Sequence, residues 1–436
     1  MLLKFLIFQL TFISTIQAST TLDSQLSSYI DSFRIKAVSK PVGLNDVKYL
    51  LGEKLFFEKE ISGNRNISCS TCHDPELGSG DGLPLPIGEG GIGVGTARVA
   101  TKSSQVISRN SSPLYNLGHE DMSNLFWDGR VRYRSDWQEY TTPSEVLNGD
   151  YPERWDITEE LGSALAAQAL FPILDHSEMR GSVGSNEIAN AKTDEQAWKL
   201  IMVRLLKINQ YAELFREAFP EASDLNIGHF GNALAHFQKH RFAVYDTPWD
   251  NYLRGNNSAM SAKEKRGALV FMEGGQCIRC HNGDLLGGFA FAGVAAPQTG
   301  PGKDIKHNDE GRFLITGNET DRYEFRIPPL RNIGLTAPYF HSGAYGSLSD
   351  VVDHYRNGPN SIDNYNSRWL DELFSENYPE QLFVETNRYM NFKKKESAHP
   401  LITGRIIRIN ESQKSDLIHF LKKSLTEMTK KQLWPE

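Results

Sequence analysis

The sequence predicts a mainly α-helical protein that contains two copies of one type of domain. Residues 51–57 and 267–271 each form a short apolar segment that leads into a loop with two cysteines. Apolar residues recur at helical spacing in 187–219 and 229–245. The glycine-rich stretch 78–95 is typical of a long loop in which the backbone approaches a bound group closely. Helices joined by extended loops are therefore expected.

The two cysteine loops carry the strings CSTCH at 69–73 and CIRCH at 277–281. Each matches C-x-x-C-H, the pattern that attaches a c-type haem through two thiols and places the histidine on the iron. A four-cysteine zinc site is the alternative, but its cysteine pairs normally lie only about 15–20 residues apart. The strings use all four cysteines of the chain, so no disulfide is expected. The sequence thus predicts two duplicated cytochrome c-like haem domains, with haem bound by Cys69, Cys72, His73, Cys277, Cys280 and His281.

The start of the chain indicates export. Residues 1–18 resemble a secretory signal peptide, with Lys4 before an apolar run and a small residue, Ala18, at the cleavage site. The run is too short to span a membrane, and no later segment is long and apolar enough to do so. Export to the periplasm agrees with c-type haem, which bacteria attach outside the cytoplasm. A polar boundary near residue 250 predicts an N-terminal haem domain at 19–250 and a C-terminal one at 251–436.

The net charge limits the possible partners, and the end of the chain predicts one more helix. The formal net charge is −7 and no basic cluster is present, which argues against nucleic acid as a partner. An acidic surface is compatible with a basic electron carrier. Residues 412–428 are predicted to close the chain as an amphipathic helix. Its apolar face would consist of Leu417, Phe420, Leu421 and Leu425.

Several short strings occur in a fixed order with the haem motifs. They are LFF at 55–57, RNSSP at 109–113, FWDGR at 126–130, Gln168 and Pro172 ahead of Glu178, and IPPLRN at 327–332 followed by TAPYFH at 336–341. In this order they resemble the bacterial di-haem cytochrome c peroxidases and the related MauG-type enzymes. The resemblance extends from about residue 51 to residue 425, which is most of the chain.

The resemblance implies a peroxidatic first haem with His73 as its proximal ligand. Glu178 matches the distal acid/base of the family, and burial would raise its pKa toward the working pH. Gln168 would hydrogen-bond the bound oxygen. Where many family members have a switch histidine, this chain has Glu89, which implies an iron that is open at rest. The alternatives are an ordinary exposed glutamate at 178 and a solvated loop residue at 89.

At the second haem the resemblance implies an unusual axial ligand opposite His281. The peroxidases use a methionine, but no methionine lies between His281 and Met390. Tyr355 stands at the corresponding position, as in MauG-type enzymes. An anionic phenolate favours ferric and higher oxidation states, so a low potential is expected. His354 and His341 are alternative ligands, and Tyr355 as an aromatic core residue is another alternative.

Two further features follow from the resemblance. Trp127 matches the tryptophan between the two haems, a relay for electrons, although a buried aromatic core residue is the alternative. The Asn110 side chain and the backbone carbonyls of Thr336 and Pro338 match an inter-haem calcium site. Oxygen donors of this kind suit calcium.

The leading hypothesis is an exported di-haem enzyme that reacts with hydrogen peroxide and oxidises a protein or other substrate at a distance, as MauG does. The first alternative is a cytochrome c peroxidase that receives electrons from a small cytochrome or a copper protein. The second is a non-catalytic electron-transfer cytochrome. Segments 138–165, 289–321 and 357–395 exceed the common family core and either shape a partner surface or are tolerated insertions. The sequence does not identify the substrate. It also does not show whether the protein forms a homodimer, as many of these peroxidases do.

Overall fold

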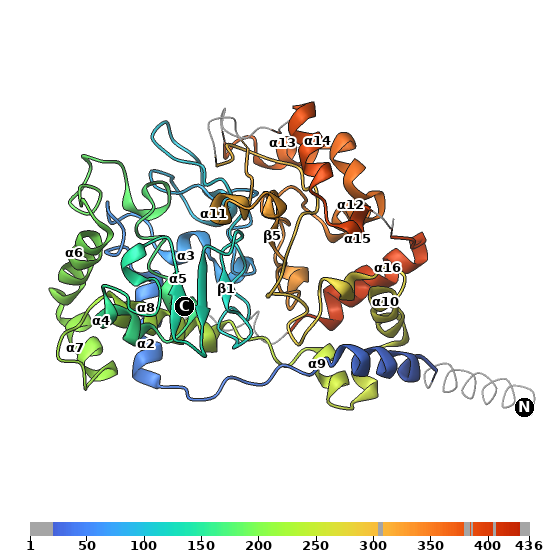
Figure 1. Cartoon of the computed structure of the whole chain (residues 1–436), viewed down its shortest axis with the longest axis horizontal. Helices are drawn as coiled ribbons and strands as arrows, with labels where there is room; N and C mark the ends of the chain where they lie inside the picture. The colour runs from blue at the N-terminus through green and yellow to red at the C-terminus, as the bar shows by residue number, and fades with distance from the viewer. Residues whose placement is uncertain (1–20, 304–307, 379–383, 385–386, 404–406, 428–436) are drawn as a thin grey trace, which may run out of the picture.

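The computed structural model describes residues 21–303, 308–378, 384, 387–403 and 407–427. The predicted signal peptide at 1–18 lies outside the described residues, as does the last residue of the helix predicted at 412–428. Helices dominate the described chain and long loops join them, which confirms the predicted fold class (Figure 1).

The first half of the molecule is a helical body built around the segment that precedes the first haem string. Helix α2 packs against α8 and α7, and α8 also packs against α4 and α5. These helices surround a core that includes Leu51, Leu55, Phe230 and Phe237, all fully buried. The helices of this half are α2 (Asp46–Phe57), α3 (Cys69–Cys72), α4 (Trp155–Leu161), α5 (Ala164–Gln168), α6 (Asp194–Leu206), α7 (Asn209–Ala218) and α8 (Ile227–Arg241).

The second half has its own core around the second haem string. Helix α10 packs against α16, and α12 packs against the turn that follows it. Trp249, Phe271 and Phe420 are buried in this core. The helices are α9 (Pro248–Leu253), α10 (Ala262–Met272), α11 (Phe313–Thr316), α12 (Leu348–Asn357), α13 (Arg368–Phe374), α14 (Arg388–Glu396), α15 (Pro400–Thr403) and α16 (Glu411–His419).

The two halves share one packing device, as expected for a duplicated domain. A Cβ atom at Gly52 of α2 would lie 2.1 Å from the carbonyl oxygen of Ala233 on α8. A Cβ atom at Gly267 of α10 would lie 2.1 Å from the carbonyl oxygen of Asp416 on α16. Only glycine allows two helix backbones to come this close. In each half, the helix before the haem string therefore crosses a later helix at a glycine.

Strands are few and lie between the helical bodies. Strands β1 (Asn124–Leu125), β2 (Val131–Arg134) and β3 (Glu139–Thr141) form an antiparallel sheet in sequence order, with Leu125 opposite Val131 and Tyr133 opposite Tyr140. Strands β4 (Phe291–Ala292) and β5 (Phe325–Arg326) form a second antiparallel pair. Arg326 N–H also donates to the carbonyl of Trp127 at 2.7 Å, which links the second pair to the first half.

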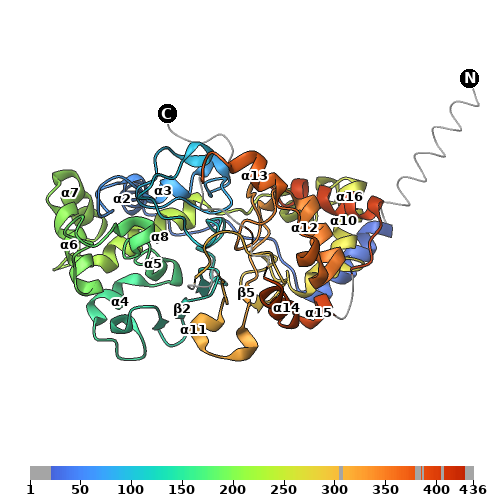
Figure 2. The same ribbon diagram turned by 90° about the horizontal axis from the view of Figure 1, so that it is seen from above.

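The beginning of the described chain belongs to the core of the second half. Residues 21–33 form a helix whose Leu26 packs in the core with Trp249 and Phe271. Lys265 on α10 forms an ion pair with Asp23 at 2.7 Å. Figures 1 and 2 show this helix beside α10 and α16, from which the chain crosses to the first half. Residues 21–33, which the predicted boundary near residue 250 assigns to the first domain, therefore pack with the second half instead.

Segment 357–395 also crosses between the halves. Phe374 and Tyr378 pack against Leu83 and Ile87 of the glycine-rich loop. The Tyr378 hydroxyl donates to the carbonyl of Leu85. This insertion therefore covers the glycine-rich loop that follows the first haem string.

The predicted helices differ from the structure mainly at their ends. The predicted stretch 187–219 contains two helices, because Thr193 caps α6, accepting from the Gln196 N–H at 3.2 Å, and the chain breaks again before α7. The predicted closing helix is regular only to His419 and continues as a wider turn. Its four predicted apolar residues are nonetheless all buried.

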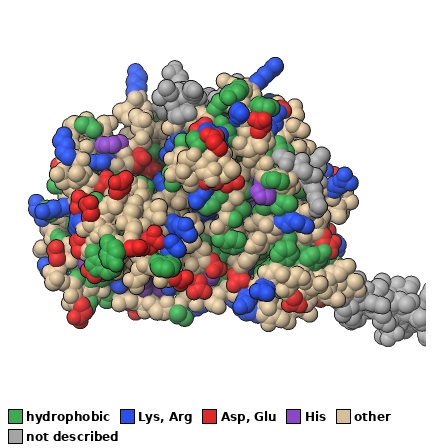
Figure 3. Space-filling model, in the orientation of Figure 1, with side chains coloured by type: hydrophobic (Ala, Val, Ile, Leu, Met, Phe, Trp, Pro, Cys, Tyr) green, Lys and Arg blue, Asp and Glu red, His purple; other side chains and the backbone are tan. Residues whose placement is uncertain are grey.

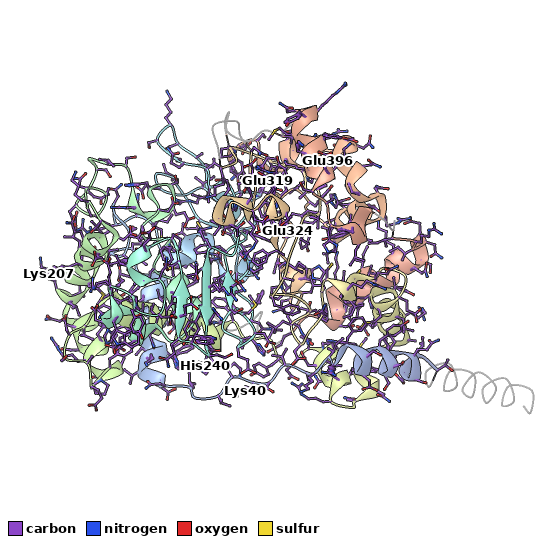
Figure 4. All side chains as sticks on the ribbon, viewed as in Figure 1. Lys40, Lys207, His240, Glu319, Glu324 and Glu396 are labelled. Atoms are coloured by element: carbon purple, nitrogen blue, oxygen red, sulfur yellow. The ribbon has the colours of Figure 1, made fainter. Side chains whose placement is uncertain are left out.

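The surface carries both charge signs without a large single-sign area on the face shown in Figure 3. In Figure 4, Lys207 after α6 and Glu396 on α14 lie on opposite halves of the molecule. Within the described part of the chain, none of the helices combines the length and apolar character that a bilayer crossing requires.

Candidate active site

A cavity in the first half brings together most of the predicted site residues. It encloses about 1220 Å³ of empty space, part of which is open to solvent. Apolar side chains such as Phe56, Ile107 and Leu125 form much of its wall, as expected for the site of a large apolar group. Its lining includes the predicted residues Cys69, Cys72, His73, Trp127, Gln168 and Glu178.

His73 is held with one ring nitrogen toward the cavity. Ser68 caps the short helix α3, and His73 follows its last residue. The His73 Nδ1 lies 3.0 Å from the carbonyl oxygen of Ser79. Because a carbonyl only accepts, Nδ1 carries the hydrogen and Nε2 keeps its lone pair, which is the usual state of a metal-ligating histidine. Burial lowers the pKa of His73, which keeps the ring neutral.

Glu178 has the environment of an acid/base group. It lies on a short π-helix (His176–Arg180) that Asp175 caps, since the Asp175 carboxylate accepts from the N–H groups of Ser177 and Glu178. Burial, and after it the charge of Asp175, raises the pKa of Glu178 to about 7, while Arg130 and Lys303 oppose the shift. A carboxyl group with a pKa near neutral pH can both take up and release a proton.

Gln168 and Pro172 belong to the wall of the same cavity as Glu178. Gln168 is the last residue of α5, which begins at Ser163, where the hydroxyl accepts from the Ala166 N–H at 3.1 Å. Both Gln168 and Pro172 line the same cavity as Glu178. The structure thus assembles the three residues that the resemblance assigned to the distal side.

Lys303 and Arg130 also line this cavity, and the sequence analysis did not assign either to the site. Lys303 comes from the insertion 289–321. Burial lowers the pKa of Lys303, the positive charges of Arg109 and Arg130 lower it further, and Glu178 opposes this. Arg130 was within a family string, but no local signal indicated that an insertion would return to this cavity.

A buried charge cluster joins the two halves beside the cavity. Arg109 donates to both oxygens of Asp309, from Nε at 2.7 Å and from Nη2 at 2.8 Å. Its Nη1 donates to Asp128, which also accepts from Arg130 at 3.2 Å. Burial alone would raise the pKa of Asp309, but Arg109 holds it well below its usual range. This cluster fixes segment 289–321 to the first half.

Trp127 lies at the boundary between the halves. Its side chain lines the cavity, and its indole Nε1 donates to the carbonyl of Asn110 at 2.8 Å. Its ring meets the His341 ring edge-on, with 6.5 Å between centroids. His341 in turn stacks on Phe325, and burial lowers its pKa to about 3. The position agrees with a relay between the sites, and His341 belongs to the packing around it.

The second haem string repeats the geometry of the first. The His281 Nδ1 lies 3.2 Å from the carbonyl oxygen of Leu286, as the His73 Nδ1 lies close to that of Ser79. Burial lowers the pKa of His281 to about 4. Tyr355 lies on α12. Burial raises the pKa of its hydroxyl, and Cys280 and Cys277 of this string raise it further. Metal ligation as a phenolate would require the loss of this proton.

His354 and His341, the alternatives to Tyr355, are engaged elsewhere. The His354 Nε2 lies 2.7 Å from the carbonyl oxygen of Val294. Its Nδ1 lies 2.9 Å from the Tyr345 hydroxyl and 2.7 Å from that of Ser361. His341 stacks on Phe325. Tyr355 is the candidate that fits a ligand position best.

Glu89 is buried, so the alternative of a solvated loop residue is wrong. It is buried, and its Oε1 accepts from the side-chain amides of Asn64 at 2.7 Å and Asn66 at 3.0 Å. Its neighbour Gly88 lines the cavity, whereas Glu89 is not part of the lining among the described residues. Glu89 is thus a buried structural residue of the loop, not a solvated one.

The residues of the predicted calcium site come from segments that meet. The Asn110 Nδ2 donates to the carbonyls of Leu83 and Pro84, both at 3.0 Å. The Asn110 N–H donates to the carbonyl of His341 at 2.7 Å, which joins Asn110 to the segment that contains Thr336 and Pro338. Because both carbonyls occupy the amide nitrogen, the amide oxygen is the atom suited to a cation.

Comparison with known proteins identifies the family. A family model described as di-haem cytochrome c peroxidase matches residues 46–258. Cytochrome c551 peroxidase of Pseudomonas aeruginosa is 31% identical over 303 residues, which cover 69% of this chain and 69% of that protein. The chain belongs to the di-haem cytochrome c peroxidase family. The methylamine utilization protein MauG of Methylorubrum extorquens is 29% identical over 315 residues, covering 72% of this chain and 70% of that protein.

Solved structures agree with the fold. A MauG-like protein associated with microbial copper homeostasis superposes with a TM-score of 0.60 at 23% identity, over 91% of this chain and 95% of that one. The di-haem peroxidase BthA of Burkholderia thailandensis gives 0.57 at 18% identity, over 92% of both chains. The protein is therefore a di-haem oxidoreductase of the peroxidase type, with two haem groups as its cofactors. Both C-x-x-C-H strings, each with its histidine Nδ1 beside a backbone carbonyl, fit covalent haem.

Proposed function

We propose that this peroxidase reacts with hydrogen peroxide at the His73 site and shares the oxidising equivalents with a second haem ligated by Tyr355. It would then oxidise a protein or another reductant at a distance, as MauG-type enzymes do. The observation that carries this proposal is the place of Tyr355 beside Cys277 and Cys280, with both nitrogens of His354 engaged elsewhere. An anionic oxygen ligand disfavours the reduced iron that a conventional donor-driven cycle requires.

At the first site the chain supplies proton transfer and orientation. Bound haem would supply an iron that takes up peroxide and accepts oxidising equivalents. Glu178 would take the proton from one peroxide oxygen and deliver it to the other, which its pKa of about 7 allows. Gln168 would orient the peroxide by a hydrogen bond, and Trp127 would pass electrons between the sites.

We also propose that the protein is exported and that it holds a calcium ion. Residues 1–18 would direct export to the periplasm, where the haem domains 19–250 and 251–436 would fold with their haems. A calcium ion held by the Asn110 amide oxygen and the carbonyls of Thr336 and Pro338 would brace the contact between the two halves.

A second candidate function is a cytochrome c peroxidase that removes hydrogen peroxide with electrons from a small cytochrome or copper protein. The similarity to a cytochrome c551 peroxidase at 31% identity favours it. This version would need the second haem to be reduced readily, which tyrosine ligation disfavours.

The test is a stopped-flow absorption experiment with the purified, fully ferric holoenzyme and one equivalent of hydrogen peroxide. A rapid and persistent spectral change would support an iron that is open at rest and the MauG-type function. If the protein reacts only after one haem has been reduced, the conventional peroxidase is correct instead.

Replacement of Tyr355 by phenylalanine should change the absorption and EPR spectra of the second haem and leave those of the first unchanged. The phenyl ring fills nearly the same space, so only the oxygen ligand is lost. The reduction potential of the second haem should rise, because an anionic donor no longer stabilises its oxidised state. Tyr365→Phe, which removes a hydroxyl that donates to Ala344, is the matched control. Unchanged spectra in Tyr355→Phe would contradict the ligand assignment.

The reaction with peroxide should depend on pH through Glu178. The carboxylate must be free to accept a proton, so the rate constant should rise with pH and reach half its maximum near pH 7. Lys303→Met removes a positive charge that lowers the pKa of Glu178. The midpoint should therefore move to higher pH in this variant, whereas Lys303→Arg should keep it. Rates measured from pH 5 to pH 9, in roughly unit steps, would decide this; equal midpoints in all three proteins would contradict it.

A further inference from the structure

Arg326 is a buried arginine that has no acidic partner among the described residues. It is as deeply buried as Arg331 and slightly more so than Arg109. Arg109 pairs with Asp309, and Arg331 pairs with Asp250 at 3.0 Å. For Arg326, burial lowers the pKa to about 10, and no charged neighbour in the described part of the chain opposes this. A buried cation without a counter-ion is strongly unfavourable, so an anion from outside the described residues is expected beside it.

The hydrogen bonds of Arg326 leave one of its nitrogens unused. Nε donates to the carbonyl of Phe126 at 3.2 Å, and Nη2 donates to the Ser112 hydroxyl at 3.5 Å. Nη1 is shielded from solvent and has no hydrogen-bond partner in the part of the chain that the structure describes. Nearly all buried polar groups in folded proteins are hydrogen-bonded. The N–H groups of Nη1 are therefore the donors that a bound ligand would satisfy.

Arg326 belongs to the wall of the cavity that also contains Cys69, Cys72 and His73. It comes from the other half of the molecule, because strand β5 carries it. Its backbone N–H donates to the carbonyl of Trp127 at 2.7 Å, which fixes the strand against the first half. The unused nitrogen thus belongs to a side chain of the second half that reaches the site of the first haem.

A haem supplies the kind of anion that this side chain lacks. Haem c keeps two propionate carboxylates after its vinyl groups have reacted with the thiols. Arginine and carboxylate groups form short, charge-assisted hydrogen bonds through parallel N–H donors. The other arginines of the described cavity wall, Arg109 and Arg130, both donate to Asp128. Arg326 is therefore the wall arginine whose guanidinium is left for a propionate.

We propose that Arg326 binds a propionate carboxylate of the first haem through Nη1. The haem that Cys69 and Cys72 attach to the first half is then also held by a cation of the second half. The inference rests on the first haem of the proposed function, and it does not depend on which residue ligates the second haem.

This contact has consequences for the first haem that can be measured. A positive charge near the iron favours its reduced state and so raises the reduction potential. The same charge holds the pKa of the propionate low, so that the carboxylate stays ionised. Without Arg326 the propionate is an unpaired anion at high pH, which lowers the potential. It takes up a proton as the pH falls, and the lost charge of the arginine is then offset.

A redox titration of the holoenzyme, followed by EPR of the two ferric haems, tests the contact. In Arg326→Met the potential of the first haem should lie below the wild-type value at about pH 8, and the difference should shrink toward about pH 5. Glu178 and Lys303 are present in both proteins, so the difference between the proteins reports the propionate. Arg326→Gln, whose amide can still donate to the Phe126 carbonyl, is a second neutral variant and should behave alike. Arg326→Lys keeps the charge and should stay closer to the wild type.

Arg134→Met is the matched control, because Arg134 is an exposed arginine on β2 that pairs with Glu139 and is not part of the described cavity wall. Its potentials should equal those of the wild type. Wild-type potentials in both neutral variants of Arg326 would overturn the contact. A difference that is the same at both pH values would overturn it too, because it would show a charge without a titrating partner.

The mass of the peptide that contains residues 69–73 separates this result from the proposed function. A wild-type peptide without haem would overturn the proposed function and the contact with it. Attached haem together with an unchanged potential in Arg326→Met and Arg326→Gln would overturn the contact alone.

Discussion

Replacing Glu178 by glutamine should slow the reaction with hydrogen peroxide by about 10²–10⁴-fold, the usual contribution of a positioned acid/base group. Glutamine has nearly the same shape and can still hydrogen-bond, but it cannot accept a proton from the peroxide. Burial, which raises the pKa of Glu178 to about 7, is what suits the carboxylate to this task. The measurement is the second-order rate constant for peroxide in stopped-flow absorption.

The control for this variant is Glu159→Gln, which changes an exposed carboxylate on α4 outside the cavity. It should react at the wild-type rate. Both variants should keep two attached haems, because Cys69 and Cys72 bind the first haem independently of Glu178. A wild-type rate in Glu178→Gln would remove this residue from the mechanism. The rate constant of Glu178→Gln should also depend only weakly on pH, which is a second, independent check.

The haem strings and the helices that precede them could be predicted because their signals are local. C-x-x-C-H fixes a covalent bond and a ligand within five residues, and apolar spacing marks α2, α10 and α16. Helix ends were harder to predict, since they depend on caps such as Thr193, whose hydroxyl begins α6 in the middle of an apolar pattern.

What the sequence could not reveal is how distant segments return to one site. Lys303 and Asp309 lie in an insertion without a motif, yet Lys303 lines the cavity beside Glu178 and Asp309 pairs with Arg109. Helix 21–33 carries an apolar face, but no periodicity specifies which of two similar cores it covers. Glu89 was assigned by its place in a loop, whereas its environment is decided by Asn64 and Asn66. In each case a tertiary contact determines the role.

Removal of Arg109 from its buried contact with Asp309 should destabilise the protein strongly. Arg109 is 5% exposed, and the Asp309 side chain is fully buried. Arg109→Met would leave the buried Asp309 carboxylate without the arginine that pairs with it, and breaking a buried pair in this way typically costs about 3–5 kcal/mol. The free energy of unfolding, from urea denaturation of the holoenzyme, should fall by this amount. The surface pair Arg368–Glu372 is the control, because Arg368→Met should cost at most about 1 kcal/mol.

The pH dependence of the same variant tests the cause. In the wild-type protein Arg109 holds the pKa of Asp309 below its unfolded value, so its stabilising effect is present at neutral pH and is lost only in strong acid. Without Arg109, burial raises the pKa of Asp309 above the unfolded value, and protonation then favours the folded state. The loss of stability in Arg109→Met should therefore shrink as the pH falls from about 7 to about 5, and Arg109→Met combined with Asp309→Asn should be more stable than Arg109→Met at neutral pH. A loss that is the same at both pH values would show that the arginine contributes packing instead of charge.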